Sequence, residues 1–366
     1  MNDDLLHRIA LTLVPNIGDV HTKTLVNHFG QAAAVFKAKT KVLESIEGIG
    51  SVRAASIKDF TDFKSAEAEI QFIEKYKITP LFITDKHYPQ RLLNCYDSPA
   101  LLYYRGTANL NSSRIVSVVG TRNNSDYGRH VTEQLITSLA SQQVLICSGL
   151  AFGIDTIAHR SAQKNNLPTV AVLAHGLDMI YPEQNKLLAK QMTDHGGLLT
   201  DFRSYTNPDK QNFPRRNRIV AGICDALVVV ESRKKGGSLI TAELANGYNK
   251  DVFAFPGRTT DTRSEGCNYL IKQNKAVLIS SAQDLIDNMR WNDSNKPPQK
   301  KQRQLFIELT AAERIIVDLL MQHEIISIDG ILGQSDVSYS TAATALLNLE
   351  MQAVIQVLPG KMYKLC

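Results

Sequence analysis

Long apolar segments are missing from this sequence. No apolar run approaches the roughly 18 residues that a membrane-spanning helix requires. The N-terminal stretch MNDDLLHRIA carries an acidic pair where a secretory signal peptide would carry positive charge. We therefore expect a cytoplasmic protein without membrane association.

Cysteine and histidine are too scattered to indicate a disulfide framework or a zinc module. The cysteines stand at positions 95, 147, 224, 267 and 366, and no CxxC pair occurs. The nine histidines form no HxxxH or HExxH pair. The sequence therefore predicts no metal site.

The common nucleotide-binding motifs are absent as well. No GxGxxG follows the first strand expected in the central region, where GTRNNSDYG has a different spacing. A Walker A sequence, GxxxxGK[ST], occurs nowhere in the chain. We therefore expect no dinucleotide or nucleoside triphosphate cofactor.

The bulk composition is that of an ordinary globular protein. The chain has 366 residues, of which 43% are hydrophobic and 21% charged, enough for two or three domains. The net charge of +5 permits an anionic partner without requiring one, so the distribution of charge has to decide.

Four segments can be distinguished along the chain. Residues 1–80 are predicted to form short helices broken by Gly and Pro, and residues 81–290 a strand–helix domain with a lead-in. Residues 291–304, WNDSNKPPQKKQRQ, are polar and basic and are predicted to be a linker. Residues 305–366 are expected to form a small final domain.

The first segment contains a glycine-rich turn at IEGIGSVRAASI (46–57) that is typical of a helix-hairpin-helix (SAM-like) domain. VPNIGDVHTKTLV (14–26) is a weaker second copy. Glycines in such turns let the backbone approach a phosphate, and the following helix directs N–H groups at the anion. A tight turn between packed helices would use the same residues, so both interpretations stay open.

The central segment alternates apolar strands with amphipathic helices. Strands are predicted at 114–120, 144–149, 169–176, 224–231, 252–257 and 276–280, with a further one at 196–202. Near-continuous apolar strands joined by helical crossovers indicate an α/β fold with a sheet covered on both faces. We predict an extended, Rossmann-like, doubly wound and mostly parallel sheet.

Glycine follows many of these strands, at the edge where such sheets bind ligands. The stretches are VVGTR (118–122), CSGLAFG (147–153), AHGLD (174–178), VESRKKGGSLITAE (230–243) and FPGR (255–258). Backbone N–H groups at these turns can approach an anion, with a helix N-terminus behind them. The pattern predicts a long phosphate-binding rim.

Positive charge is concentrated at the same edge. NFPRRNRIVAG (212–222) places Arg215, Arg216 and Arg218 just before a strand. Further basic residues follow the strands, namely Arg122, Arg233, Lys234, Lys235 and Arg258. A lone arginine more often lies on a solvated face or in an ion pair, but several at one edge favour an extended polyanion. Phe213 and Phe152 are candidates for base stacking.

The spacing of the three arginines also predicts their directions. On a helix beginning near Pro214, Arg215 and Arg218 share a face while Arg216 points elsewhere. We expect them to border an open groove, in which they need not be buried.

The central segment closely resembles the DNA processing protein A family, also called DprA or Smf. The resemblance rests on SVVGTR (117–122), SGLAFGIDTIAH (148–159), DMIYPEQN (178–185), NFPRRNRIVAG (212–222), VVVESRKKGGSLITAELA (228–245), VFAFPG (252–257) and EGCNYLI (265–271). It implies a protein that binds and protects incoming single-stranded DNA during natural transformation and loads the RecA recombinase onto it. It also implies a homodimer through the Rossmann domain and no established catalysis.

Carried over by the resemblance, the implied DNA contacts lie in four stretches. They are Gly120, Thr121 and Arg122; Ser148 and Gly149; Phe213, Arg215, Arg216, Asn217 and Arg218; and Gly237, Ser238 and Leu239.

Three further polar residues, in SGLAFGIDTIAH and DMIYPEQN, could have either a functional or a structural role. Asp155 and His159, four apart on a predicted helix, could form an acid–base pair, but a capping aspartate and a tied-down histidine are favoured. Asn185 is expected to shape a turn.

The alternative function is that of a nucleotide phosphoribohydrolase. GGSLITAE (236–243) is similar to the PGGxGTxxE loop of those enzymes, with Glu243 in the place of their glutamate. The residues between the glycines and the glutamate differ from that loop. The mediator function is therefore preferred.

The final segment is predicted to be a winged helix, with three helices and a two-stranded wing. Its presumed recognition helix, 338–351, has no Lys or Arg. Residues 310–366 hold three basic and six acidic residues, a net charge of −3. Because duplex binding requires phosphate neutralisation, we expect this domain to serve protein contacts or self-regulation.

Overall fold

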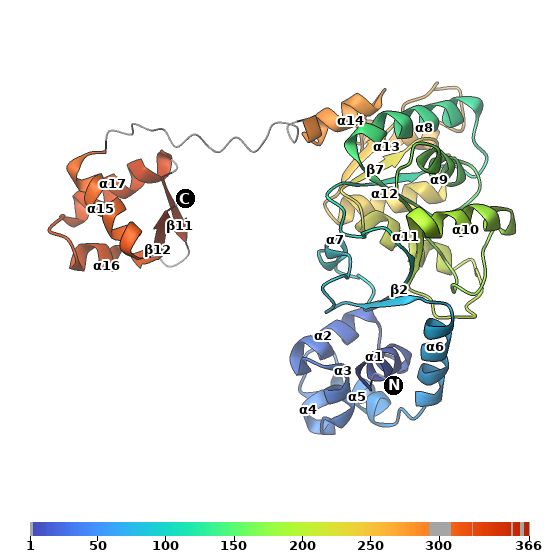
Figure 1. Cartoon of the computed structure of the whole chain (residues 1–366), viewed down its shortest axis with the longest axis horizontal. Coiled ribbons are helices and arrows are strands. Elements are labelled where there is room, and N and C mark those ends of the chain that lie inside the picture. The colour runs from blue at the N-terminus through green and yellow to red at the C-terminus, as the bar shows by residue number, and fades with distance from the viewer. Residues whose placement is uncertain (1–2, 293–308, 324, 353, 359–361, 366) are drawn as a thin grey trace. The chain divides into compact units, whose positions relative to one another are not determined.

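The structure is a computed structural model that describes residues 3–292, 309–323, 325–352, 354–358 and 362–365 (Figure 1). The chain divides into two compact units, residues 1–293 and 294–366. From residue 293 onward, the linker predicted at 291–304 lies outside the described residues. In the described ranges, no helix combines the length and apolar character needed to cross a membrane.

The first unit begins with a cluster of six helices around an apolar core that includes Leu25, Val35 and Ile70. Gly48 and Gly50 adopt φ values of 80° and 60°, a left-handed conformation that glycine enters without strain. Arg53 joins the two hairpin turns by donating to the carbonyl oxygens of Asn16 (3.2 Å) and Gly48 (3.1 Å). The helices are α1 (Asp3–Leu13), α2 (Asp19–Phe29), α3 (Ala32–Lys37), α4 (Thr40–Glu44), α5 (Gly50–Lys58) and α6 (Phe63–Lys75).

A mixed sheet forms the rest of the first unit, and within residues 3–292 it has nine strands in the order β1-β2-β6-β5-β4-β3-β7-β8-β9. The pairs β1–β2 and β2–β6 are antiparallel, and the other neighbours are parallel. The strands are β1 (Thr79–Phe82), β2 (Leu101–Gly106), β3 (Ile115–Val119), β4 (Leu145–Ser148), β5 (Thr169–Val172), β6 (Gly196–Thr200), β7 (Ala226–Val229), β8 (Asp251–Ala254) and β9 (Val277–Leu278).

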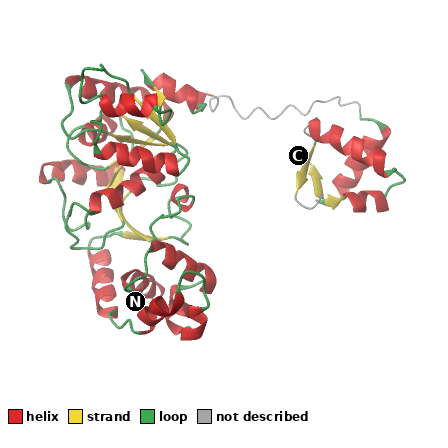
Figure 2. Ribbon diagram, turned by 180° about the vertical axis from the view of Figure 1, so that it is seen from behind, coloured by secondary structure: helices red, strands yellow, loops and turns green. Residues whose placement is uncertain are grey.

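Helices cover both faces of this sheet (Figure 2). Apolar side chains of α7, α11, α12 and α13 pack on one face, and those of α8, α9, α10 and α14 pack on the other. The central strands are buried along their whole length, which explains their uninterrupted apolar sequences. The helices are α7 (Gln90–Leu93), α8 (Asp126–Leu139), α9 (Ile154–Lys164), α10 (Lys186–His195), α11 (Asn212–Gly222), α12 (Gly237–Gly247), α13 (Glu265–Lys272) and α14 (Ala282–Asn288), with 3-10 turns η1 (Ala140–Gln142) and η2 (Glu183–Asn185).

The doubly wound, mostly parallel sheet predicted from the sequence is confirmed. Each predicted strand overlaps an observed strand, although the last is shortened to Val277–Leu278. β1 and β2 were not predicted, because they lie in the lead-in and pair antiparallel at one side of the sheet. Phe82, Leu101 and Tyr103 of these strands pack into the core of the N-terminal helices.

The second unit is a winged helix. Among its described residues are α15 (Ala311–Gln322), α16 (Ile328–Gly333) and α17 (Tyr339–Met351), together with β10 (Ile326–Ser327), β11 (Ile355–Leu358) and β12 (Met362–Leu365). The predicted wing is the β11–β12 hairpin, and β10 adds a short third strand beside β12.

His159 of α9 is a buried histidine whose titration should affect stability. Its Nδ1 lies 2.7 Å from Thr169 Oγ1, and its Nε2 has no hydrogen-bond partner among the described residues. Burial, reinforced by the Arg216 charge, lowers the pKa of His159 from 6.5 to about 3. The unfolded chain therefore binds a proton that the folded chain excludes, so stability is lost as pH falls below the unfolded pKa.

We expect His159→Gln to reduce the loss of unfolding free energy between about pH 7 and about pH 5 by about 2 kcal/mol, since Gln has no proton to gain. Urea denaturation at the two pH values, with wild type as the control, measures this difference. Equal acid-induced losses in the two proteins would contradict the assignment.

Candidate nucleic-acid interface

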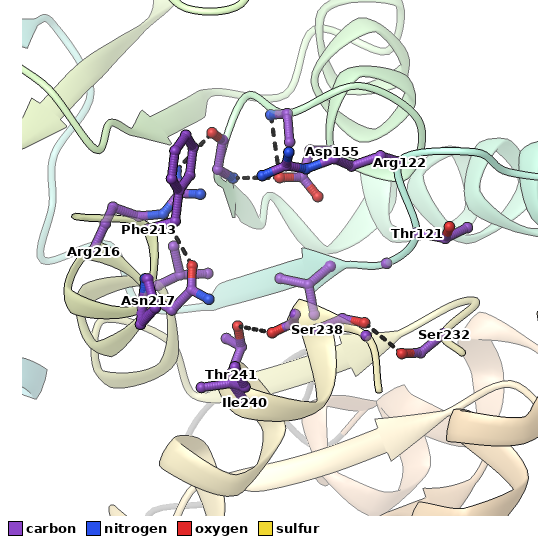
Figure 3. Close-up of a pocket in the computed structure, with 18 of the residues that line it drawn as sticks. Thr121, Arg122, Asp155, Phe213, Arg216, Asn217, Ser232, Ser238, Ile240 and Thr241 are labelled. Atoms are coloured by element: carbon purple, nitrogen blue, oxygen red, sulfur yellow. Dashed lines mark hydrogen bonds between the residues drawn. The ribbon is translucent and has the colours of Figure 1, made fainter. Parts of the chain in front are cut away.

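A pocket beside the central sheet lies where the strand order reverses. From β3 the chain proceeds outward through β4, β5 and β6 on one side, and through β7, β8 and β9 on the other. Doubly wound sheets bind ligands at this switch point, beyond the carboxyl ends of the strands. A pocket of about 500 Å³ opens there, lined by residues that follow β3, β4 and β7 and by the starts of α11 and α12 (Figure 3).

Arg216 forms one wall of the pocket and is held by backbone carbonyls. Its Nη1 donates to Gly149 O at 2.7 Å and to Val172 O. A Cβ at Gly149 would lie 2.6 Å from the Arg216 guanidinium, so only glycine leaves room for it. Burial lowers the pKa of Arg216, and the nearby Asp155 carboxylate opposes that shift. The sequence-based expectation that these arginines need not be buried is therefore wrong for Arg216.

The turn after β3 is fixed by a buried carboxylate at the end of β7. Glu231 accepts hydrogen bonds from Ser125 N (3.0 Å) and Ser125 Oγ (2.5 Å), and Thr121 N donates to Glu231 O (2.7 Å). These contacts hold Gly120, Thr121 and Arg122 at the mouth of the pocket. Arg122 lies over the Phe213 ring, with its Cζ 5.1 Å from the ring centroid.

The opposite wall is the N-terminus of α12. Gly237 and Ser238 begin this helix, whose first N–H groups have no intrahelical partners and favour an anion. Ser238 Oγ donates to Ser232 Oγ at 2.8 Å, which ties the helix start to the loop after β7. Ile240 and Thr241 complete this wall one turn later.

The charges on the pocket walls are predominantly positive. Arg122, Arg216, Arg233 and Lys235 line it, against the single carboxylate of Asp155. Asp155 is buried and accepts from Gly149 N (3.2 Å) and Ala151 N (3.3 Å). Burial raises the pKa of Asp155, and the Arg216 charge opposes that rise. The pocket therefore suits an anionic ligand with a planar group to place against Phe213.

Most residues implied by the family resemblance meet in this pocket. Nine of them line it: Gly120, Thr121, Arg122, Gly149, Phe213, Arg216, Asn217, Gly237 and Ser238. The other four, Ser148, Arg215, Arg218 and Leu239, do not. Ser148 Oγ donates to Val118 O at 2.6 Å inside the sheet, and Leu239 packs in the apolar core.

Arg215 and Arg218 share the other face of α11, as their spacing predicts. Arg218 Nη2 donates to Asp201 Oδ2 (2.6 Å) and to Asp19 Oδ2 (2.9 Å), and Arg215 Nε lies 3.3 Å from the same Asp201 oxygen. Burial alone lowers the pKa of Arg218, but Asp201 and Asp19 outweigh it and raise the pKa. Since Asp19 begins α2, Arg218 joins the N-terminal helices to the sheet.

The glycine-rich rim is shorter than predicted. Glycines after β3 and β4 and those starting α12 line the pocket, whereas Gly176 and Gly257 do not. Neither Phe152 nor Arg258 lines it. Strand order explains the difference, because only β3, β4 and β7 end beside the switch point.

The polar residues with competing interpretations have structural partners. Asp155 caps a loop and His159 contacts Thr169, as the favoured interpretation predicts. Asn185 is buried and donates to Leu150 O (2.9 Å) and Thr156 Oγ1 (2.8 Å). Glu243 is exposed, lies outside the pocket and pairs with Lys275 at 2.7 Å.

Several pocket residues were not among the predicted contacts. They include Asp155, Ser232, Ile240 and Thr241, whereas Arg233 and Lys235 were predicted as part of the basic edge. Helical spacing from Gly237 and Ser238 identifies Ile240 and Thr241, since residues three and four apart share a face. Nothing in the described part of the chain groups three or more His, Cys, Asp or Glu side chains to hold a metal ion.

Comparison with known proteins agrees with this geometry. The model of the family described as "DNA recombination-mediator protein A" matches residues 79–290, which is more than half of the chain. The chain belongs to this family. A helix-hairpin-helix model matches residues 8–70, and a DprA winged helix model matches residues 297–361.

Curated relatives are similar over most of their length. The chain is 39% identical to the DNA processing protein DprA of Bacillus subtilis, over 77% of this chain and 95% of the relative. It is 37% identical to the Streptococcus pneumoniae protein, over 67% of this chain and 90% of the relative. It is 32% identical to Protein Smf of Escherichia coli, over 81% of this chain and 80% of the relative.

Two solved structures of the family superpose on the chain. The DprA structure from Streptococcus pneumoniae has a TM-score of 0.68 at 32% identity, covering 77% of this chain and 97% of that one. The Helicobacter pylori structure, reported for its single-stranded DNA binding mode, has a TM-score of 0.54 at 28% identity. The match covers 59% of this chain and 97% of that one.

The two faces of α11 generate a prediction about stability. Arg218→Ala removes a partner from Asp201, whose side chain is only 2% exposed. We expect it to cost about 3 kcal/mol or more of unfolding free energy, because it leaves a buried charge poorly compensated. Arg215→Ala, at a side chain that is 52% exposed, should cost under about 1 kcal/mol.

Urea unfolding of the two variants beside wild type tests this difference. If Arg218→Ala unfolds like Arg215→Ala, Arg218 does not join the helices to the sheet.

Proposed function

We propose that this chain binds single-stranded DNA in the pocket at the β3–β7 switch point and acts as a mediator of recombination. On this proposal it protects DNA that has entered the cell during natural transformation and loads the RecA recombinase onto it. The observation that carries the proposal is the pocket itself, which is lined by four cations, a helix N-terminus and the Phe213 ring, with Arg122 lying over that ring.

The chemistry of a single strand matches these walls. Phosphates require fixed positive charge and free N–H groups, and unpaired bases offer ring faces for stacking. Phe213 is half-buried beneath Arg122 and meets Tyr181 edge-on, with ring centroids 6.1 Å apart. The described single-strand binding mode of the Helicobacter pylori relative supports the same assignment.

The chain is proposed to act by binding and not by catalysis, in the cytoplasm. The alternative, a nucleotide phosphoribohydrolase, needs a glutamate beside the bound ribose and phosphate. Glu243 is exposed and paired with Lys275, outside the pocket, which disfavours that alternative.

We also propose that the chain forms a homodimer through the outer strand of its Rossmann-like sheet. β9 ends the sheet, and its Val277 and Leu278 are 47% and 50% exposed. An open strand edge with exposed apolar side chains is a site for pairing with another chain.

The pocket predicts the effect of removing one arginine. Arg122→Ala should weaken binding of single-stranded oligonucleotides and lower the slope of log affinity against log salt by about 1, since one phosphate contact is lost. Fluorescence anisotropy over a salt series measures both quantities. The matched control is Arg160→Ala on α9, an exposed arginine outside the pocket, which should leave both unchanged.

The same two variants test whether delivery to RecA depends on DNA binding in the pocket. Wild type and Arg160→Ala should speed RecA assembly on single strands coated with single-strand binding protein, and Arg122→Ala should not. Wild-type affinity and salt dependence in folded Arg122→Ala would contradict the pocket assignment.

The sheet edge predicts a change of oligomeric state. Leu278→Lys should convert a dimer into a monomer, because a charge on the open edge opposes strand pairing. Light scattering after size-exclusion chromatography gives the mass, with Leu187→Lys on the exposed face of α10 as the control. A Leu278→Lys protein that keeps the dimer mass would exclude this edge as the interface.

A further inference from the structure

A strained and exposed tyrosine lies outside the pocket. Tyr205, in the loop between β6 and α11, has φ of 61°, a left-handed conformation that large side chains rarely adopt. Glycine or asparagine would adopt it more readily. The side chain is 75% exposed, so burial in a core does not account for a tyrosine there.

The surrounding structure holds this conformation from several directions. Tyr205 N donates to Asp178 Oδ1 at 2.7 Å. On one side, Ser204 donates from its N (3.0 Å) and Oγ (2.5 Å) to the buried carboxylate of Glu69 on α6. On the other, Gly176 N donates to Thr206 O at 3.0 Å. The ring of Tyr205 is therefore presented by a fixed loop.

Aromatic rings and basic side chains surround it. The Tyr205 ring meets the Phe72 ring of α6 edge-on, with the ring centroids 5.7 Å apart. The Phe72 ring centroid lies 4.5 Å from that of the partly exposed Tyr76. Lys75 Nζ lies 5.3 Å from the Tyr76 ring centroid. The two contributing segments, 69–77 and 201–211, expose four basic residues, Lys75, Lys77, Arg203 and Lys210, and two acidic residues, Glu74 and Asp209.

Contacts between neighbouring segments link these tyrosines to the pocket. Phe213 in the pocket meets the exposed ring of Tyr181 at 6.1 Å. Tyr181 is three residues from Asp178, which binds Tyr205 N, and three residues of chain span at most about 11 Å. The segment of Tyr181 is thus linked to Tyr205 through Asp178, and Tyr205 is linked to Tyr76 through the Phe72 ring.

We propose that Tyr205 and Tyr76 form a second stacking site, which holds bases of the same single strand that occupies the pocket. The inference rests on the proposed function and extends its binding path. Exposed ring faces with flanking cations are what sequence-tolerant single-strand binding requires. A strand is favoured over a protein partner because the segments that carry these rings expose more basic than acidic residues and are linked to the pocket through Asp178 and Tyr181.

Tyr205→Asn tests the site without threatening the fold, since asparagine enters the left-handed conformation more easily than tyrosine. We expect its melting temperature to equal or exceed that of wild type. Its affinity for an oligonucleotide of about 20 nucleotides should fall about tenfold, and its affinity for one of about 6 nucleotides should not change. Tyr205→Phe, which keeps the ring, should bind both like wild type.

Two further variants distinguish the possible outcomes. Tyr96→Asn removes another exposed tyrosine of the first unit and should leave both affinities unchanged. Arg122→Ala should weaken binding of both lengths. If Tyr205→Asn binds the long strand like wild type while Arg122→Ala does not, the second site is wrong and the pocket stands. If wild type binds neither strand, the proposed function itself fails.

Crosslinking provides a readout that altered stability would not change. Strands of about 20 nucleotides carrying 4-thiothymidine should crosslink on irradiation to the peptide containing Tyr205. The absence of that peptide beside crosslinks to the Phe213 peptide would overturn the second site.

Discussion

The packing of the Arg216 guanidinium against Gly149 sets the position of the α11 wall of the pocket. Two carbonyl oxygens, at the ends of β4 and β5, accept from this side chain, so α11 is anchored over the carboxyl edge of the sheet. A side chain at position 149 would occupy the space of the guanidinium. With Arg216 anchored, Phe213 and Asn217 project from the same helix into the pocket (Figure 3).

The opposite face of α11 has a different role. Arg215 and Arg218 meet Asp201, and Arg218 also reaches Asp19 at the start of α2. One short helix therefore serves both the pocket and the junction with the N-terminal helices. The loop that precedes α11 contains Tyr205. Its neighbour Ser204 donates to Glu69 of α6, and Tyr205 N donates to Asp178 in the segment after β5. α11 and the loop before it therefore contact the N-terminal helices and also hold the exposed ring of Tyr205.

Much of the fold was accessible from local pattern. Uninterrupted apolar strands and helical crossovers predict a doubly wound sheet because strands buried on both faces need apolar residues throughout. β1 and β2 escaped prediction, since their pairing partners are distant in sequence and their side chains serve two cores. The winged helix was predictable because α15 is strongly amphipathic and the three helices begin at side-chain N-caps, Thr310, Ser327 and Ser338.

The sequence by itself determined the family, the sheet and the division of directions among the three arginines, because these follow from motifs and helical spacing. Only the tertiary structure decided which arginine enters the pocket and which strand ends border it. Strand order is a long-range property, and it brings β3, β4 and β7 together while separating the glycines after β5 and β8. The partners of a guanidinium are also distant in sequence. Arg216 lines the pocket because it donates to Gly149 O, whereas Arg218 lies outside the pocket because it pairs with Asp201.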